Sequence, residues 1–140
     1  MYANVYSKAN STNATKFLRE LIENAPYKVH SIQVDGGSEF MKDFEDACKE
    51  LEIPLFVLPP EKPTYNGKIE RSNRVFRKEF YANMSEDTIV GAHRELINFM
   101  QKYNSYRPYA SLRGLTPLEC ISKYSSGDHL CLTSVGTWTG

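Results

Sequence analysis

The first 58 residues alternate between two hydrophobic periods, and this alternation constrains the fold more than any other feature of the chain. Short apolar or alternating runs at residues 2–6, 29–35 and 53–58 predict three strands. The run at 53–58 is continuously apolar, which suits a buried strand. Between these runs, apolar residues recur at helical spacing, which predicts one helix after residues 11–13 and another that Ser38 caps. Strands and helices in this order are typical of an α/β layer with parallel strand pairing and right-handed crossovers.

The remainder of the chain predicts helices joined by turns that contain proline. A proline-rich loop at residues 59–65 precedes a helix expected over about 68–82, and another helix is expected from about 86 to 103. Pro117 starts a short further helix, because proline suits the first helical position. We expect the apolar residues of this short helix to face inward. They are Leu118, Ile121 and Tyr124.

Length and charge narrow the class of protein. A chain of 140 residues suits one domain, which we place at residues 1–124, followed by a weakly ordered tail at 125–140. Lys and Arg total 17, as do Asp and Glu, so a polyanionic partner would have to be recognised by local charge. No apolar run approaches the roughly 20 residues of a membrane span, and the cysteines show no metal-binding spacing. These features predict a cytoplasmic protein with no membrane partner.

Two acidic residues stand out by position. Asp35 follows an expected parallel strand and precedes two glycines, at the strand end where α/β proteins place their sites. Glu70 lies in the first turn of an expected helix, where the helix dipole favours an ionised carboxylate. Carboxylates that converge from separate elements suit Mg²⁺, so Asp35 and Glu70 are candidate catalytic and metal-binding residues. Each alone also fits an ordinary structural role, Asp35 in a turn and Glu70 as a surface acid.

The helix around Glu70 is locally basic. Between residues 66 and 81 five cations oppose two acids, a net charge of 5 − 2 = +3. Arg74 and Arg77 lie four and seven positions after Glu70 and share its face. Cations behind a carboxylate on one face suit contacts with nucleic-acid phosphates, whereas the alternative is a basic face that is merely solvated. The candidate DNA-binding residues are Tyr65, Asn66, Lys68, Arg71, Arg74, Arg77 and Lys78.

Three motifs occur in order along the chain. They are Val34-Asp35-Gly36-Gly37-Ser38-Glu39-Phe40, Asn66-Gly67-Lys68-Ile69-Glu70-Arg71-Ser72-Asn73, and Tyr103-Asn104 through Arg107-Pro108 to Leu115-Thr116-Pro117. Over about residues 2–124 the chain resembles the integrase core of bacterial insertion-sequence transposases and retroviral-type integrases. The 70 − 35 = 35 positions from Asp35 to Glu70 are similar to the family's spacing between its second and third catalytic acids. One departure is Tyr109, where such transposases commonly have histidine.

This resemblance implies a fold, a reaction and ligands. The implied fold is α/β and RNase H-like, a mixed sheet flanked by helices. The implied reaction is metal-dependent phosphodiester hydrolysis and strand transfer on DNA, with two Mg²⁺ or Mn²⁺ ions in the intact family. The resemblance also implies a bacterial protein in which Arg77 and Arg74 contact DNA phosphates.

A larger departure concerns the first acid of the family's triad, which lies on the first strand of the domain. Residues 1–34 contain no Asp, so the chain resembles a core that lacks its first one or two strands and one metal ligand. We therefore expect metal binding to be weak or absent, and no catalysis by this chain alone. The expected strand at residues 2–6 would lie on a sheet edge. This predicts a homo-oligomer (a dimer) formed by edge-strand pairing or by exchange of the N-terminal segment.

Two functions are compatible with these features. The first is a fragment of a DDE-type transposase or integrase core that needs an acid from another chain. The second is a non-catalytic remnant that binds nucleic acid or takes part in oligomerisation. A small-molecule enzyme has no support, because the sequence has no Gly-rich phosphate loop, nucleophile elbow or metal-spaced His/Cys set.

Overall fold

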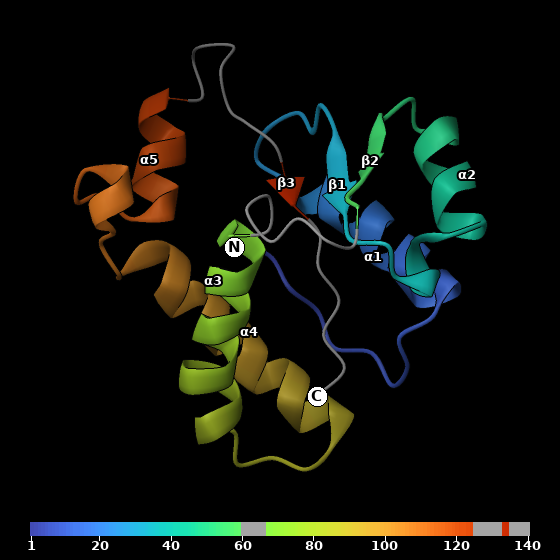
Figure 1. Cartoon of the computed structure of the whole chain (residues 1–140). Helices are drawn as coiled ribbons and strands as arrows, with labels where there is room; N and C mark the ends of the chain where they lie inside the picture. Colours follow the sequence, from blue (N-terminus) through green and yellow to red (C-terminus); the bar gives the residue numbers. More distant parts are fainter. Residues whose placement is uncertain (60–66, 125–132, 135–140) are drawn as a thin grey trace.

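The computed structural model describes residues 1–59, 67–124 and 133–134. Figure 1 shows a small sheet with α1 and α2 in one part of the molecule, and α3, α4 and α5 in the other. The expected proline-rich loop, apart from Pro59, and most of the expected tail lie outside the described residues. Within the described ranges, no helix is both long enough and apolar enough to cross a bilayer.

The sheet contains three described strands in the order β2-β1-β3. β1 (Ile32–Val34) pairs in parallel with β2 (Leu55–Val57), with Ile32 opposite Leu55. The backbone of β3 (Thr133–Ser134) pairs in parallel with the other side of β1. The parallel pairing expected for the first half is confirmed, although each strand is shorter than its apolar run.

The strand expected at residues 2–6 is absent, and this expectation is wrong. The N-terminal segment (residues 1–6) is instead bound by α4 (Ile89–Ser105). The Ala3 N–H donates to Met100 Sδ at 3.1 Å, and the Asn104 side chain donates to the Met1 carbonyl at 2.7 Å. Side chains of a helix thus satisfy backbone groups that a strand would use for pairing, and both sides of β1 are already occupied.

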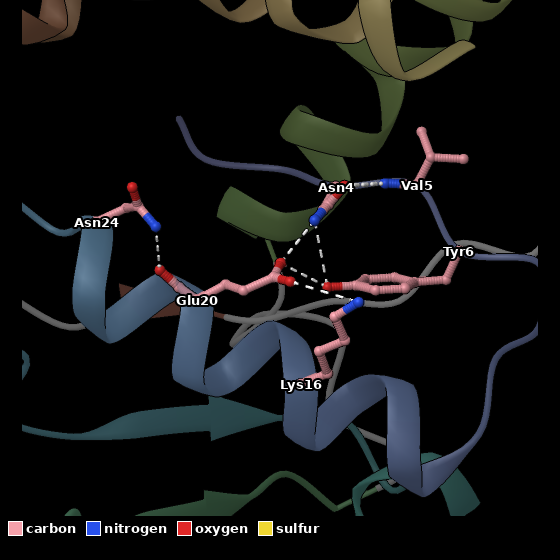
Figure 2. Close-up of polar contacts among 6 residues, drawn as sticks. All are labelled: Asn4, Val5, Tyr6, Lys16, Glu20 and Asn24. Atoms are coloured by element: carbon pink, nitrogen blue, oxygen red, sulfur yellow. Dashed lines mark hydrogen bonds and ion pairs between the residues drawn. The ribbon is translucent and has the colours of Figure 1, made fainter. Parts of the chain in front are cut away.

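The other end of the N-terminal segment contacts α1 (Ser11–Asn24) through one carboxylate (Figure 2). Glu20 accepts hydrogen bonds from Asn4 Nδ2 at 2.6 Å and from the Tyr6 hydroxyl at 2.7 Å, and Lys16 lies 3.9 Å away. Burial, and then the hydrogen bond to Glu20, raise the pKa of the Tyr6 hydroxyl above its ordinary value. The N-terminal segment therefore links α1 to α4.

The two helices of the first half begin differently from the expectation. The N-cap of α1 is Asn10, whose side chain accepts the Asn13 N–H at 2.9 Å. Ser38 does not cap a long helix, because a 3₁₀ turn (Ser38–Phe40) comes first and α2 (Asp43–Glu50) starts after it. Lys42 separates the two with a φ of 52°, a left-handed conformation that interrupts the helix.

The main core lies between α1, α2 and β1, as the apolar spacing predicts. Phe40 and Phe44 pack edge to face with ring centroids 5.1 Å apart. On β1, Ile32 and Val34 have no exposed surface. The buried residues of this core are Ala14, Leu18, Leu21, Val29, Ile32, Val34, Phe40, Phe44, Ala47 and Cys48. The strand that precedes Asp35 is therefore packed into the main core of the molecule.

β2 is not the buried strand that its apolar run predicts. Phe56 is 55% exposed and Val57 is 53% exposed. β2 lies at an edge of the described sheet, where a strand has a paired neighbour on one side only. A continuous apolar run does not distinguish an edge strand from a central one, and the expectation of burial is wrong here.

In the second half of the chain, α3 and the two turns that follow it form one continuous helical stretch, which packs against α4 through aromatic rings. α3 (Gly67–Val75) continues into a π-helical turn, η3 (Phe76–Phe80), and a 3₁₀ turn, η4 (Tyr81–Asn83). Neighbouring rings of an aromatic cluster have centroids 5.0 to 6.2 Å apart. The aromatic cluster consists of Phe76, Phe80, Phe99, Tyr103 and Tyr109.

α5 (Pro117–Tyr124) starts at the expected proline, and its first turn has reciprocal caps. The Glu119 carboxylate accepts the Thr116 N–H at 2.8 Å, and the Thr116 hydroxyl accepts the Glu119 N–H at 3.3 Å. These bonds lower the pKa of Glu119. The expectation that the apolar face points inward is wrong for Leu118, 47% exposed, and Tyr124, 39% exposed.

An open groove explains the exposure of Leu118. Its volume is about 870 Å³, and it lies between the N-terminal segment and residues of α1, α3, α4 and α5. Leu118 and Ile121 line one wall, and Phe17 of α1 lines another. The helical half thus meets the sheet side across a gap that side chains do not fill.

Candidate functional site

Asp35 lies immediately after β1, at the carboxyl end of the strand. Its side chain is exposed, and its Oδ1 accepts the Gly37 N–H at 3.3 Å. This bond is the turn-forming role that the sequence left open for Asp35. The same carboxylate is open to solvent and directly follows a strand of the core. The turn therefore does not prevent it from binding a cation.

Glu70 lies in the first turn of α3 and is also exposed. In the view of Figure 1, the first turn of α3 is the end of that helix directed toward the sheet. The strand-end and helix-start positions expected for the two acids are therefore both present. Their joint approach to one cation remains a prediction.

Asp35 and Glu70 carry the donor atoms of a candidate cation site. Carboxylate oxygens have the hard donor chemistry that Mg²⁺ and Mn²⁺ prefer. Among the residues that the structure describes, however, no group of three or more His, Cys, Asp or Glu side chains is placed to hold an ion. Asp35 and Glu70 therefore stay candidate ligands, to which a bound cation would add oxygens of water or substrate.

The cations of α3 and η3 lie on the outside of the molecule. Arg71, Arg74, Arg77 and Lys78 are all exposed, whereas Phe80 on the same stretch is buried. The helical stretch is therefore amphipathic in the sense that the sequence predicts, with apolar rings toward α4 and cations outward. Tyr65 and Asn66 lie outside the described residues, as does the side chain of Lys68.

An ion pair at the end of this stretch was not anticipated from the sequence. Arg107, in the turn after α4, donates from Nη1 to the Glu79 carboxylate in η3. This hydrogen bond raises the pKa of the Arg107 guanidinium. The guanidinium carbon also lies 5.4 Å from the centroid of the Tyr109 ring. The only sequence signal was that Arg107 and Tyr109 stand in the third motif, which does not identify Glu79 as a partner.

Comparison with solved structures defines the class of fold. The chain is similar to the structure titled as the catalytic core domain of BIV integrase, with a TM-score of 0.68 and 24% sequence identity. The similarity covers 87% of this chain and 77% of that one. The fold is therefore that of an integrase core, an α/β and RNase H-like architecture, as the sequence motifs imply.

Comparison with protein families adds a match in sequence. Residues 51–117 match the family described as integrase core domain. The matched segment includes Glu70, the exposed cations and Arg107, whereas Asp35 lies before it. The comparison with curated proteins found no match. The resemblance drawn from the motifs is confirmed: the chain has the fold of an integrase core and a segment that matches the integrase core family in sequence.

Proposed function

We propose that this chain is the DNA-binding part of an integrase- or transposase-type core and that the cations of α3 and η3 contact the phosphate backbone. One observation carries the proposal: four exposed cations lie along one continuous helical stretch within the segment that matches integrase cores. They are Arg71, Arg74, Arg77 and Lys78. Arg and Lys on a helix bind phosphates without reading sequence, so binding depends on salt. Tyr65, Asn66 and Lys68 belong to the same proposed surface.

The proposed chemistry is metal-dependent strand transfer and hydrolysis of DNA by the assembled protein. Asp35 and Glu70 are the residues of this chain that would hold Mg²⁺ or Mn²⁺. Bound metal ions would activate and stabilise the oxygens of a phosphodiester. Because two carboxylates compensate less of a divalent ion's charge than three, we propose that this chain alone binds the ions weakly and is inactive until another chain supplies a third acid.

The non-catalytic alternative needs only the exposed cations of α3 and η3. In that alternative the chain binds DNA or assembles with other chains and has no metal site at all. Titration calorimetry with Mn²⁺ separates the two. Weak binding that Asp35→Asn and Glu70→Gln each abolish supports the catalytic fragment, and no binding supports the remnant.

Self-association is also part of the proposal, although its structural basis changes. Residues 2–6 are not a strand, so an exposed edge is provided by β2, whose Phe56 and Val57 are exposed. Exposed apolar edge strands pair with other chains, and exchange of the N-terminal segment is the second route. Sedimentation velocity over a range of concentrations tests this, and a monomer at every concentration contradicts it.

DNA binding is tested with fluorescence anisotropy on labelled duplexes of two unrelated sequences. If three or four phosphates are contacted, the Kd rises roughly 40- to 150-fold between about 50 and 200 mM salt. Arg74→Gln/Arg77→Gln reduces the salt slope by about two. The control Arg19→Gln/Lys49→Gln removes the same charge from α1 and α2 and leaves the slope unchanged. An equal decrease of the salt slope in both double variants would contradict the proposed DNA-binding surface.

Catalysis is tested separately by nicking of supercoiled DNA in the presence of Mg²⁺ or Mn²⁺. We expect no nicking by this chain alone. Nicking that Asp35→Asn or Glu70→Gln abolishes would overturn the proposal that a third acid must come from elsewhere.

A further inference from the structure

We propose that Arg107 is a positioning residue: by binding Glu79 it fixes η3 and thereby orients Arg77 and Lys78 toward DNA. The inference rests on the proposed function and adds to it a residue that does not lie on the DNA-facing helix. The inference concerns the orientation of the cations on η3 rather than their charge.

Glu79 is held at a point where the helix is irregular. In η3 the Tyr81 N–H bonds to both the Arg77 and the Phe76 carbonyl, and the second bond has the wider spacing of a π-helical turn. The Glu79 side chain accepts from Arg107, and its carbonyl accepts from Asn83 Nδ2 at 3.0 Å. Because a π turn is short and less regular than an α-helix, its orientation depends on contacts such as these.

Arg107 is itself anchored by the aromatic cluster. Its guanidinium carbon lies 5.4 Å from the centroid of the Tyr109 ring, and that ring is centred 5.0 Å from the Tyr103 ring. The Tyr103 ring is centred 6.2 Å from that of Phe99 on α4. A planar guanidinium that stacks on a ring and donates to a carboxylate has a defined direction, which a lysine ammonium lacks.

The inner side of η3 is fixed by the same cluster. Phe76 and Phe80, the two ends of η3, each lie with ring centroids 5.5 Å from Phe99. Arg77 and Lys78 lie between these rings in the sequence and are exposed. The aromatic contacts therefore hold the inward face of η3 against α4. The Glu79–Arg107 ion pair fixes how the C-terminal end of η3 is rotated about the helix axis.

The free energy that an exposed ion pair contributes decides which measurement can detect the Glu79–Arg107 contact. Glu79 and Arg107 are both close to half exposed, and exposed pairs add little to global stability. A change in melting temperature is therefore a poor readout. Local amide exchange in η3 and DNA affinity are better, because both depend on the orientation of the turn.

The experiment compares matched variants of two ion pairs. Glu79→Gln and Arg107→Lys alter the Glu79–Arg107 ion pair. Glu86→Gln and Arg94→Lys are the controls, since Arg94 Nη2 pairs with Glu86 at 2.8 Å on the same half of the molecule. Each variant and its control carry the same change in charge. Hydrogen exchange at residues 76–83 and Kd for duplex DNA are measured for all four.

We expect faster exchange at residues 76–83 in Glu79→Gln and Arg107→Lys, and DNA binding roughly three- to tenfold weaker than in their controls. This sign is diagnostic, because removing a negative charge two residues from Arg77 would by itself strengthen DNA binding. Tighter binding by Glu79→Gln than by Glu86→Gln would mean that the lost negative charge matters more than the orientation of η3, and it would overturn the positioning role.

Unchanged exchange at residues 76–83 overturns the inference whatever the affinities are. If the unaltered chain does not bind DNA, the proposed function fails. In that case the exchange measurement still decides whether Arg107 fixes η3. The two failures are therefore distinguishable.

Discussion

The sheet side and the helical half of this molecule are stabilised in different ways. The sheet side, residues 1–57, has a continuous core in which Leu18, Ile32, Val34 and Phe44 have no exposed surface. In the helical half, residues 67–124, the aromatic cluster is mostly only partly buried. The comparison teaches that Asp35 follows a strand of the well-buried core, whereas Glu70 and the cations lie on the less buried half.

The connection between the halves is also informative. The N-terminal segment bonds to α4 at one end and to Glu20 of α1 at the other, beside an open groove of about 870 Å³. Few apolar contacts cross a groove, so hydrogen bonds of this segment contribute a larger share of the association between the halves than they would in a filled interface.

The largest expected effect tests the difference in packing directly. Phe44→Ala lowers the free energy of unfolding by about 3–5 kcal/mol, because a fully buried ring leaves a cavity in the core. Phe99→Ala in the half-buried aromatic cluster costs less, about 1–2 kcal/mol. Urea denaturation followed by circular dichroism measures both. Phe56→Ala, at an exposed position, is the control and changes stability by less than about 0.5 kcal/mol. Equal losses for Phe44 and Phe99 would remove the distinction between the halves.

The sequence predicted the sheet side well because helical spacing and burial coincide there. Leu18 and Leu21 on α1, and Phe44, Ala47 and Cys48 on α2, are buried as their spacing predicts. The prediction failed for residues 2–6 and for β2, where apolar composition alone does not say which neighbours a segment has. Paired strands and bound extended segments have similar local sequences, and long-range contacts distinguish them.

A smaller effect tests the connection between the halves. Tyr6→Phe removes the hydroxyl that donates to Glu20 and lowers the free energy of unfolding by about 0.5–1.5 kcal/mol. Amide exchange in residues 1–6 rises at the same time, because the segment loses a contact with α1. Tyr106→Phe is the matched control, since Tyr106 is 74% exposed. Unaltered exchange in Tyr6→Phe would show that the N-terminal segment is not held through Glu20.

The smallest expected effect concerns the pH dependence of the helical half. The hydrogen bonds with Thr116 lower the pKa of Glu119 in the folded protein. The resulting stabilisation is complete above the ordinary glutamate pKa of about 4.3, and it is lost as pH falls through the folded value. The difference in melting temperature between the unaltered chain and Glu119→Gln is therefore largest near neutral pH and closes in acid. Glu23→Gln on α1 is the control, and a gap that persists at low pH would contradict the cap.

The candidate site was predicted in part. The sequence identified Asp35 at a strand end and Glu70 in a first helical turn, and the structure places each in that local setting. It did not identify Glu79 as the partner of Arg107, because the two are separated by 28 positions and neither spacing nor composition relates them. The expected joint metal site and the contribution of Tyr65 and Asn66 stay predictions.

By itself the sequence determined the order of helices and strands between residues 11 and 124, the class of fold and the outward position of the cations, because these follow from local hydrophobic period and from short motifs. The tertiary structure alone decided that residues 1–6 bind helices instead of a strand, that β2 is exposed, and that Arg107 meets Glu79. These features depend on which surfaces meet after folding, and a contact between distant residues has no periodicity that the sequence could reveal.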